Sequence, residues 1–357
     1  MEMIVLNEKL ERIYIMDFYE SLIWTDRYFS CGDFELYTTM RSGLLNYIKQ
    51  GRYLQIRESD HAMIIEKIQI TSDIDTGNKL IVTGRSLESL LDRRIIWGQV
   101  VVNAPIQSAI KGLITDNIIS PSDPKRRIPN FIFQEVSDPA INAVHIRAQY
   151  TGDNLYDVIQ MMCEESGIGF KIILNDSGQF VFTLYSGKDR SYNQTENPYV
   201  IFSPKFDNML SGNYMESNSN LKNVTLIAGE GEGKDRKYVS IGNKEGLERR
   251  ELFTDARDIS SKKEDGTVIP QDEYIKQLSR RGIEKLLEHP SVVSFEGQIE
   301  TKIMFEYGKD FFNGDIVQIA NEYGHETQVR ILEIVMSENS EGITVYPTFK
   351  TLTQEGV

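Results

Sequence analysis

The chain carries one strand pattern twice, as Ile65-Glu66-Lys67-Ile68-Gln69-Ile70-Thr71-Ser72-Asp73 and as Ile331-Leu332-Glu333-Ile334-Val335-Met336-Ser337-Glu338-Asn339. A glycine and a return strand follow each copy, Gly77 before 80–82 and Gly342 before 343–345. A Gly-Asp step that opens another strand precedes each copy, at 32–33 and at 314–315. Alternation, an acidic turn and a return strand indicate a β-hairpin. The pattern therefore predicts one small β-unit used twice, unless two unrelated hairpins resemble each other by chance.

Length and composition are those of a globular protein with about two or three domains. The chain has 357 residues, of which 40% are hydrophobic. We find no apolar run long enough to span a membrane and no secretory signal at the start, so we expect a soluble chain without a membrane anchor, made in the cytoplasm. Cys31 and Cys163 are the only cysteines, and we expect both to be packed thiols rather than a disulfide framework.

The charge of the chain argues against stable nucleic-acid binding. The 53 acidic and 39 basic residues give a net charge of −14, which repels a polyanion unless the basic residues are clustered. Surface acidity commonly serves solubility. It could also line a passage through which a polyanion moves without adhering.

The order of predicted elements is β, then α+β, then β again. Residues 1–85 alternate in the manner of an antiparallel sheet, and Ser86 is expected to cap a short helix bearing Leu87, Leu90 and Leu91. Helices are predicted after Pro105 and after Asn154, followed by a hairpin over 170–184. From about residue 200 the strands return, with one helix at about 272–288. We therefore predict a mainly β fold with three domains, a first β domain at 1–102, an α+β insert at 103–200 and a second β domain at 201–357.

No pattern of residues supplies a catalytic or metal centre. His61, His145, His289 and His325 are the only histidines, and none has another His or Cys at metal-ligand spacing. The run Gly229-x-Gly231-x-Gly233 lacks the following helix that a phosphate-binding loop requires, and we interpret it as a hairpin tip. We expect no catalytic residue, no cofactor and no metal ion, and hence a protein that is not an enzyme.

Arg249-Arg250 is a basic pair in acidic surroundings. Glu248 and Glu251 flank the pair, and Asp255 and Asp258 follow it. Such an arrangement favours ion-pair networks within or between subunits over phosphate binding.

Three separated blocks of sequence resemble those of siphophage tail-tip hub proteins. The blocks are Tyr19-x-x-Leu22-x-Trp24-x-x-Arg27-Tyr28-x-x-x-Gly32-x-Phe34-Glu35-Leu36; Gly229-Glu230-Gly231-Glu232-Gly233 through Arg236, Val239, Gly242 and Leu247-x-Arg249-Arg250-Glu251-x-x-x-Asp255-Ala256-Arg257-Asp258; and Tyr307-Gly308-Lys309-Asp310-Phe311 with Gly314-Asp315-x-Val317 and Arg330-Ile331-x-Glu333-Ile334. They occur in the same order as in that family and span nearly the whole chain.

The resemblance implies a structural protein of a phage or prophage tail tip or baseplate. Its fold would contain two similar β-barrel-like domains per protomer, so that a homotrimer forms a ring of approximate six-fold symmetry between the hexameric tail tube and the three-fold tip. The implied partners are distal tail or tail-tube proteins and tip or receptor-binding proteins, in the virion. Longer relatives append peptidoglycan-cleaving or receptor-binding modules, and we expect none here because little sequence follows Phe349.

Two sets of site residues follow from the hub interpretation. If the trimer surrounds a DNA channel, the acidic hairpin tips are candidates to line it: Asp73, Asp75, Glu230 and Glu232. Arg249, Arg250 and Asp255 are candidates for a subunit contact.

The alternative is a carbohydrate-binding or carbohydrate-active β-protein. Trp24, Trp97, Tyr192 and Tyr199 could stack on sugar rings if they form one groove. A binder of this kind would work as a monomer, whereas a hub would self-associate with cyclic symmetry.

Overall fold

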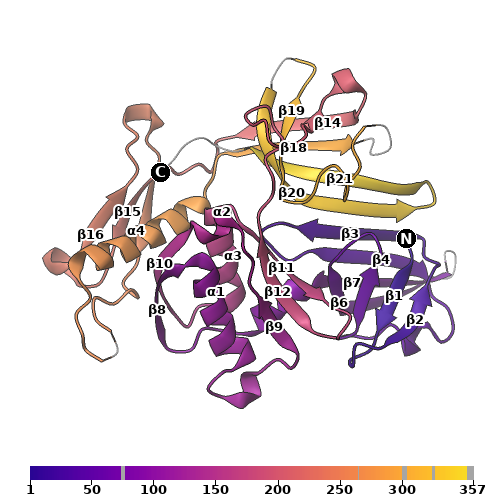
Figure 1. Ribbon diagram of the computed structural model, residues 1–357, viewed down its shortest axis with the longest axis horizontal. Coiled ribbons are helices and arrows are strands. Elements are labelled where there is room, and N and C mark those ends of the chain that lie inside the picture. Colours follow the sequence, from indigo (N-terminus) through magenta and orange to yellow (C-terminus); the bar gives the residue numbers. More distant parts are fainter. Residues whose placement is uncertain (74–76, 264, 300–303, 324–325, 352–357) are drawn as a thin grey trace.

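The protein folds around one large β-sheet, with the insert packed beside it and a small helix-backed sheet at the far side of the insert (Figure 1). The computed structural model describes residues 1–73, 77–263, 265–299, 304–323 and 326–351. In Figure 1 the N-terminal strands, in indigo, lie directly against the C-terminal strands, in yellow. No helix in these described ranges is long and apolar enough to cross a membrane.

The large sheet has 13 strands drawn from both ends of the chain. Their spatial order is β14 (Met209–Ser217), β18 (Val292–Ile299), β21 (Gly342–Thr351), β20 (Glu326–Asn339), β3 (Ser21–Arg27), β4 (Asp33–Thr39), β7 (Gly77–Ser86), β6 (Ala62–Asp73), β5 (Tyr53–Ile56), β1 (Met3–Leu6) and β2 (Arg12–Met16). Two further strands, β13 (Ile201–Phe202) and β19 (Ile316–Ala320), join it through β20.

One antiparallel ladder unites the two β regions. β20 pairs with β3 from Glu333 opposite Arg27 to Glu338 opposite Leu22. The guanidinium Nε of Arg27 lies 2.7 Å from a carboxylate oxygen of Glu333 across this ladder. The mainly β class is thus confirmed, but no pairing among the described residues joins β2 to β14, so the sheet is not closed into a barrel.

A core that includes Ala62 and Ile64 of β6 joins this sheet to the insert, and a second apolar core lies within the sheet region itself. The second core draws from both ends of the chain, with Leu22, Trp24 and Phe34 packed in the same cluster as Met336 and Phe349. Burial of such side chains contributes about 1.5–3 kcal/mol each. The N-terminal and C-terminal β regions therefore depend on each other for their stability.

The insert is the predicted α+β unit. It contains β8 (Gln99–Pro105), α1 (Ile106–Ile114), β9 (Phe131–Gln134), α2 (Pro139–Asn142), β10 (His145–Thr151), α3 (Leu155–Ser166), β11 (Gly169–Leu174) and β12 (Phe180–Tyr185). The side chain of Asn154 caps α3 by accepting from the Tyr156 N–H at 2.8 Å, and Gly167 ends it with φ 67°. Because both cap residues lie next to α3 in the sequence, the helix could be predicted from the sequence alone.

Shorter turns connect these elements. They are η1 (Leu44–Asn46), η2 (Leu87–Arg93), η3 (Thr115–Ile119), η4 (Pro124–Arg126), η5 (Pro204–Phe206), η6 (Gly233–Asp235) and η7 (Gly246–Glu248). The prediction that Ser86 caps η2 is wrong, because its hydroxyl oxygen accepts from the Gly32 N–H at 2.7 Å and makes no cap bond.

A small unit of separate architecture interrupts the C-terminal β region. Strands β16 (Tyr238–Ile241), β15 (Val224–Ala228) and β17 (Glu251–Asp255) form a three-stranded sheet, and α4 (Gln271–Leu287) packs on one face of it. Its core is independent of the large sheet and centres on Ile227, Tyr274 and Leu278. The helix predicted at 272–288 is confirmed, while the three domain boundaries stay predictions.

The repeated sequence pattern forms two hairpins of matching detail. β6 pairs with β7 and β20 pairs with β21, and both ladders shift register at the same step of the pattern, between Ile65 and Lys67 and between Ile331 and Glu333. The Gly-Asp strands do not correspond, since β4 pairs with the return strand β7 whereas β19 pairs with the outgoing strand β20. The repetition thus covers the hairpin and its bulge but not the Gly-Asp step.

Tyr28 lies where the N-terminal sheet, the insert and the C-terminal strands meet. Its N–H donates to the Leu332 carbonyl at 2.9 Å, and its own carbonyl accepts from Phe170 at 3.3 Å. Its buried hydroxyl lies 3.1 Å from the Gly167 carbonyl and accepts from the Gly187 N–H at 3.1 Å. One residue therefore bonds to three separate parts of the chain.

We expect substitution of Tyr28 to loosen this junction. Tyr28→Ala should lower the free energy of unfolding by about 3–5 kcal/mol, because it removes a fully buried ring, and Tyr28→Phe by about 1–2 kcal/mol, because it removes only the hydroxyl. Urea unfolding followed by circular dichroism measures both. Tyr323→Ala is the control, since that ring is 80% exposed. Equal losses of unfolding free energy in Tyr28→Ala and in the control would contradict the role of Tyr28 at this junction.

Candidate functional site

Most of the predicted site residues lie in or next to the small unit of β15, β16, β17 and α4. Glu230 and Glu232 occupy the loop from β15 to β16, and Arg249 and Arg250 precede β17, which ends at Asp255. Of the other two acidic residues, Asp75 lies outside the described residues. Asp73 closes the β6–β7 ladder opposite Gly77, at a hairpin remote in sequence from the unit.

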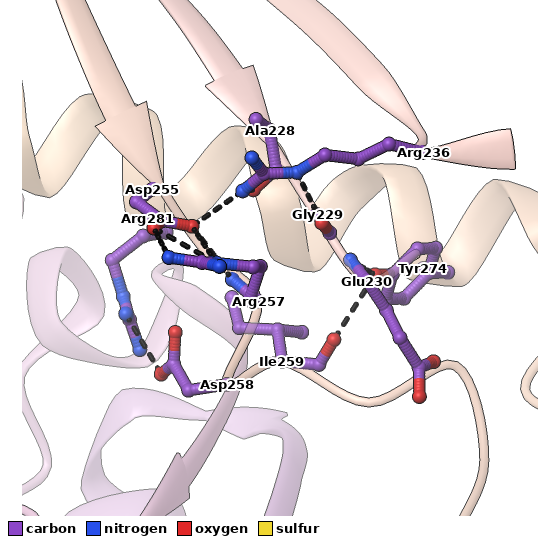
Figure 2. Close-up of polar contacts among 10 residues, drawn as sticks. All are labelled: Ala228, Gly229, Glu230, Arg236, Asp255, Arg257, Asp258, Ile259, Tyr274 and Arg281. Carbon is purple, nitrogen blue, oxygen red and sulfur yellow. Dashed lines mark hydrogen bonds and ion pairs between the residues drawn. The ribbon is translucent and has the colours of Figure 1, made fainter. Parts of the chain in front are cut away.

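Asp255 is the centre of an arginine cluster at the end of β17. Figure 2 shows its carboxylate between the guanidinium groups of Arg236 and Arg257. Arg257 donates from Nη2 at 2.7 Å and from Nε at 3.0 Å. These bonds, with Arg257 foremost and Arg236 assisting, lower the pKa of Asp255 to about 2. Asp255 is therefore ionised at any physiological pH.

Arg236 links the Asp255 carboxylate to the end of β15 and to the loop that follows β15. Its Nε donates to the Gly229 carbonyl at 3.0 Å and its Nη2 to the Ala228 carbonyl at 2.9 Å (Figure 2). The side chain is mostly buried, with 14% exposed, although Asp255 is open to solvent. Arg236 thus holds the end of β15 against β17, a role that the sequence did not indicate.

Arg249 and Arg250 both contact their own chain. Arg249 lies 2.6 Å from Glu251 in an ion pair. The Arg250 N–H donates to the Asn223 side chain at 2.9 Å, and its guanidinium donates to the Asn218 carbonyl. Arg249 thus forms an ion pair within the subunit, Arg250 bonds to neutral groups, and the role of the two residues at a subunit contact stays a prediction.

Glu230 is turned toward the loop after β17 rather than outward. Its carboxylate accepts from both the N–H and the hydroxyl of Ser261, at 2.7 and 2.6 Å, and these bonds lower its pKa. Its N–H donates to the Tyr274 hydroxyl at 2.9 Å, and that hydroxyl donates to the Ile259 carbonyl at 3.0 Å (Figure 2). Glu232 is exposed, as Glu230 is, and its side chain makes no cap bond to the short η6 turn.

A partly buried ion pair joins the small unit to the insert, and a second ion pair lies within the unit. Arg280 on α4 lies 2.5 Å from Glu165 on α3, and Arg281 lies 3.0 Å from Asp258. Burial raises the pKa of Glu165 to about 7 in spite of the Arg280 charge. The Arg280-Arg281 pair was visible in the sequence, but its partners lie more than 20 residues away and could not be assigned.

Sequence analysis also missed a buried cluster around His61. The imidazole Nδ1 lies 3.2 Å from the Glu88 carboxylate, and both side chains are nearly or fully buried. Asp26 completes the cluster, with its carboxylate accepting from Ser59 at 2.7 Å. Burial disfavours the charged imidazole, but Asp26 and Glu88 outweigh it and raise the pKa of His61 to about 9. No spacing rule predicts this cluster, because Asp26 comes from β3, His61 from the residue before β6 and Glu88 from η2.

The four aromatic residues proposed for a sugar groove do not form one. Trp24 is fully buried in the sheet core. Tyr192 and Tyr199 meet edge to face at 5.7 Å between ring centroids, whereas Trp97 lies under the Arg126 guanidinium at 4.1 Å. In the part of the chain that the structure describes, no cluster of three or more His, Cys, Asp or Glu residues is arranged to hold a metal ion.

Comparison with known proteins gives one family and several similar structures. The family model of the Siphovirus ReqiPepy6 Gp37-like protein matches residues 2–349. No curated protein sequence matches the chain. Every structure described below is at most 13% identical to it, so this likeness concerns the fold alone.

Three tail proteins share the fold over almost their full length. The prophage MuSo2 43 kDa tail protein from Shewanella oneidensis aligns with a TM-score of 0.60 at 12% identity, covering 98% of each chain. A tail protein from Neisseria meningitidis MC58 gives 0.58 at 12%, with 98% of this chain and 96% of that one covered. Prophage tail protein gp18 from Listeria monocytogenes gives 0.56 at 13%, with 99% and 96% covered.

The buried His61 predicts a specific pH dependence of stability. Its pKa is raised from 6.5 to about 9 in the folded protein, so the stabilisation is complete below pH 6.5 and is lost as the pH rises through 9. We expect the free energy of unfolding to fall by about 2–3 kcal/mol over this range. Urea unfolding at each half pH unit measures this fall.

Two variants distinguish the contribution of His61 to this pH dependence from the contributions of other titrating groups. His61→Gln should be less stable at pH 6.5 by about 3 kcal/mol, because it leaves Asp26 and Glu88 without their charged partner, and its fall between pH 6.5 and 9 should be smaller. His145→Gln, at an exposed histidine, should follow the wild type. An unchanged slope in His61→Gln would refute the assignment.

Proposed function

The chain belongs to the Siphovirus ReqiPepy6 Gp37-like family of phage tail proteins, and from this we propose that it is the structural hub of a phage or prophage tail tip. The proposal rests on how much of the chain is matched, because the family match and the three tail-protein folds each extend over almost the whole chain. The role is one of assembly rather than catalysis, in the virion tail, after synthesis in the cytoplasm of the bacterial host.

In the proposed assembly three copies form a ring that joins the tail tube to the three-fold tip. Two hairpins with the same bulge in each chain support this arrangement, because three chains would present six similar hairpins to a six-fold partner. The neighbours of the ring would be distal tail or tail-tube proteins on one side and tip or receptor-binding proteins on the other.

The ring would surround the passage for DNA. A net charge of −14 per chain supports this role, since repulsion keeps a polyanion from adhering to the wall. Asp73, Asp75, Glu230 and Glu232 are the proposed lining residues. Glu230 and Glu232 are both exposed in the small unit, but the Glu230 carboxylate is bonded to Ser261. An electron-microscopy structure of the assembled tip tests this directly, and a basic or apolar lumen would exclude it.

The sugar-binding alternative lacks a supporting observation. Its four aromatic residues are divided between the core and separate surface positions. We therefore retain the hub as the single proposed function.

We expect the purified chain to have the mass of three 40.9 kDa subunits in mass photometry or sedimentation equilibrium. If the isolated chain needs its neighbours, the same stoichiometry should appear on co-expression with the adjacent tail proteins. A monomer under both conditions would overturn the hub proposal.

Arg250 provides a test of the proposed subunit contact. Arg250→Glu should raise the trimer dissociation constant by at least about tenfold, because it places like charges across the contact. Arg12→Glu is the control, since Arg12 is an exposed arginine on the edge strand β2. Circular dichroism verifies the fold of both variants. If Arg250→Glu and the control associate equally well, Arg250 does not lie at the contact.

A further inference from the structure

The small unit is connected to the large sheet by two short segments that lie side by side. One segment, 218–223, leads from β14 into β15, and the other, 288–291, leads from α4 into β18. β14 and β18 are paired neighbours, and beyond their ladder the Lys222 N–H donates to the His289 carbonyl at 3.0 Å. Both connections therefore enter the unit at one place, which is the arrangement of a hinge.

The core of the small unit is separate from the core of the insert, although α4 lies beside β10 and α3 (Figure 1). Among the described residues, no side chain of α4 belongs to the insert's apolar cluster, and none of the insert belongs to the unit's own cluster. Tyr150 of β10 packs in the insert's core, while its hydroxyl lies 3.5 Å from a carboxylate oxygen of Glu284 on α4. The Gln99 side chain donates to the Lys262 carbonyl at 3.4 Å. Both bonds are at the long limit of hydrogen-bond geometry.

Buried polar atoms without partners are concentrated at this contact. Within the ranges that the structure describes, ten buried side-chain nitrogen or oxygen atoms make no hydrogen bond, and five of them belong to residues of β10, α3 and α4. The residues are Gln149 on β10, Glu165 on α3, and Gln277 and Arg280 on α4. A buried polar atom without a partner has lost its hydration and costs free energy, so the closed contact is less stable than its buried area suggests.

Gln149 and Gln277 lie on facing sides of β10 and α4. Ala148 packs in the insert's core, so the next residue, Gln149, lies on the opposite face of β10, and α4 contacts this strand from outside the insert. Gln277 lies one helical turn before Arg280 and two turns before Glu284, and therefore shares their side of α4. The two glutamines are 4% and 2% exposed. Closure of this contact thus buries two amide oxygens that it does not pair.

The two helices are not packed together along their length. A cleft of about 480 Å³ lies between them, with Val158 and Met161 of α3 on one side and Glu284 and Leu287 of α4 on the other. The helix contact therefore depends on few groups.

One strong polar contact holds α4 against α3. Arg280 donates to Glu165 at 2.5 Å, and its Nε lies 3.5 Å from Glu284 on its own helix. The neighbouring Arg281 pairs instead with Asp258 of the small unit itself, at 3.0 Å (Figure 2). The two adjacent arginines thus differ in which part of the chain they bond.

We propose that the contact of α4 with α3 and β10 is a latch, and that the small unit turns about its paired connections when this latch opens. Opening breaks the bond between Arg280 and Glu165 and brings the unpaired amide oxygens of Gln149 and Gln277 into water, where they are hydrogen-bonded. Hydration offsets the lost contact, so both positions are populated in solution. The motion takes place within one chain and does not depend on the proposed trimer.

Double electron–electron resonance measures both positions. One spin label is attached to the small unit at Ser240→Cys and one to the insert at Lys111→Cys, both at exposed residues, in a Cys31→Ser background. An excess of unlabelled chain ensures that only distances within one chain are measured. The control pair, Lys111→Cys with Glu35→Cys on the large sheet, spans the junction at Tyr28. We expect the distance distribution of the first pair to be at least about twice as wide as that of the control. Equal widths would overturn the latch and leave the hub proposal standing.

Substitutions of the two adjacent arginines identify the contact that closes the latch. Arg280→Gln should raise the ratio of open to closed molecules by at least about fivefold, because it removes the bond to Glu165. Arg281→Gln is the matched control, since the two side chains are 12% and 15% exposed, and it should change the ratio by less than about twofold. Circular dichroism verifies the fold of both variants. An equal effect of the two substitutions would refute the role of Arg280.

Apolar replacement of the glutamines tests the opposite direction. Gln149→Leu/Gln277→Leu should lower the ratio of open to closed molecules by at least about fivefold, because the closed contact then buries no unpaired amide. An unchanged ratio in a folded double variant would show that the unpaired amides do not open the latch. If the double variant does not fold, the wild-type distance distribution and the comparison of the two arginines decide the proposal.

Discussion

The contact between Tyr28 and the three parts of the chain around it is the constraint on which the rest of the architecture depends. The ring is fully buried, and two glycines approach it so closely that a Cβ at either position would lie within 2.3 Å of a ring carbon. These are Gly169, at the start of β11, and Gly314, just before β19. With the hydroxyl bonded to the insert and the main chain bonded to β20 and β11, the large sheet and the insert have one relative position.

The small unit is attached to the rest of the molecule in a different way. It contributes no strand to the large sheet, and α4 connects it to the insert through polar contacts such as Arg280 with Glu165. Its core lies on the helix side of the sheet, and Leu226, Tyr238 and Phe253 on the other side are exposed. The arginine cluster at Asp255 adds a fixed charge pattern at the edge of that surface.

Short-range patterns predicted the elements well. The 3.6-residue spacing of apolar residues located α3 and α4, and Asn154 and Gly167 marked the ends of α3 because caps are decided by neighbouring residues. Alternation located both hairpins, including the one at 62–86 and the one at 326–351. The prediction that Ser86 caps η2 was wrong, because its hydroxyl oxygen accepts from the Gly32 N–H instead. That N–H comes near Ser86 only after the strands have paired. Within the candidate site, local reasoning selected Asp255 with Arg249 and Arg250, whereas the arginines that bond to this carboxylate are Arg236 and Arg257. The carbonyl partners of Arg236 depend on the folded loop.

The sequence by itself determined the mainly β class, the α+β insert, the repeated hairpin and the absence of a recognisable catalytic pattern, because each of these depends on residues close together in the chain. Only the tertiary structure decided that both β regions share one open sheet, since β3 and β20 are separated by about three hundred residues and alternation does not specify a strand's partner. The same limit applies to burial and charge. The raised pKa of His61 and the burial of Trp24 both come from groups that folding brings together, and no local pattern encodes those neighbours.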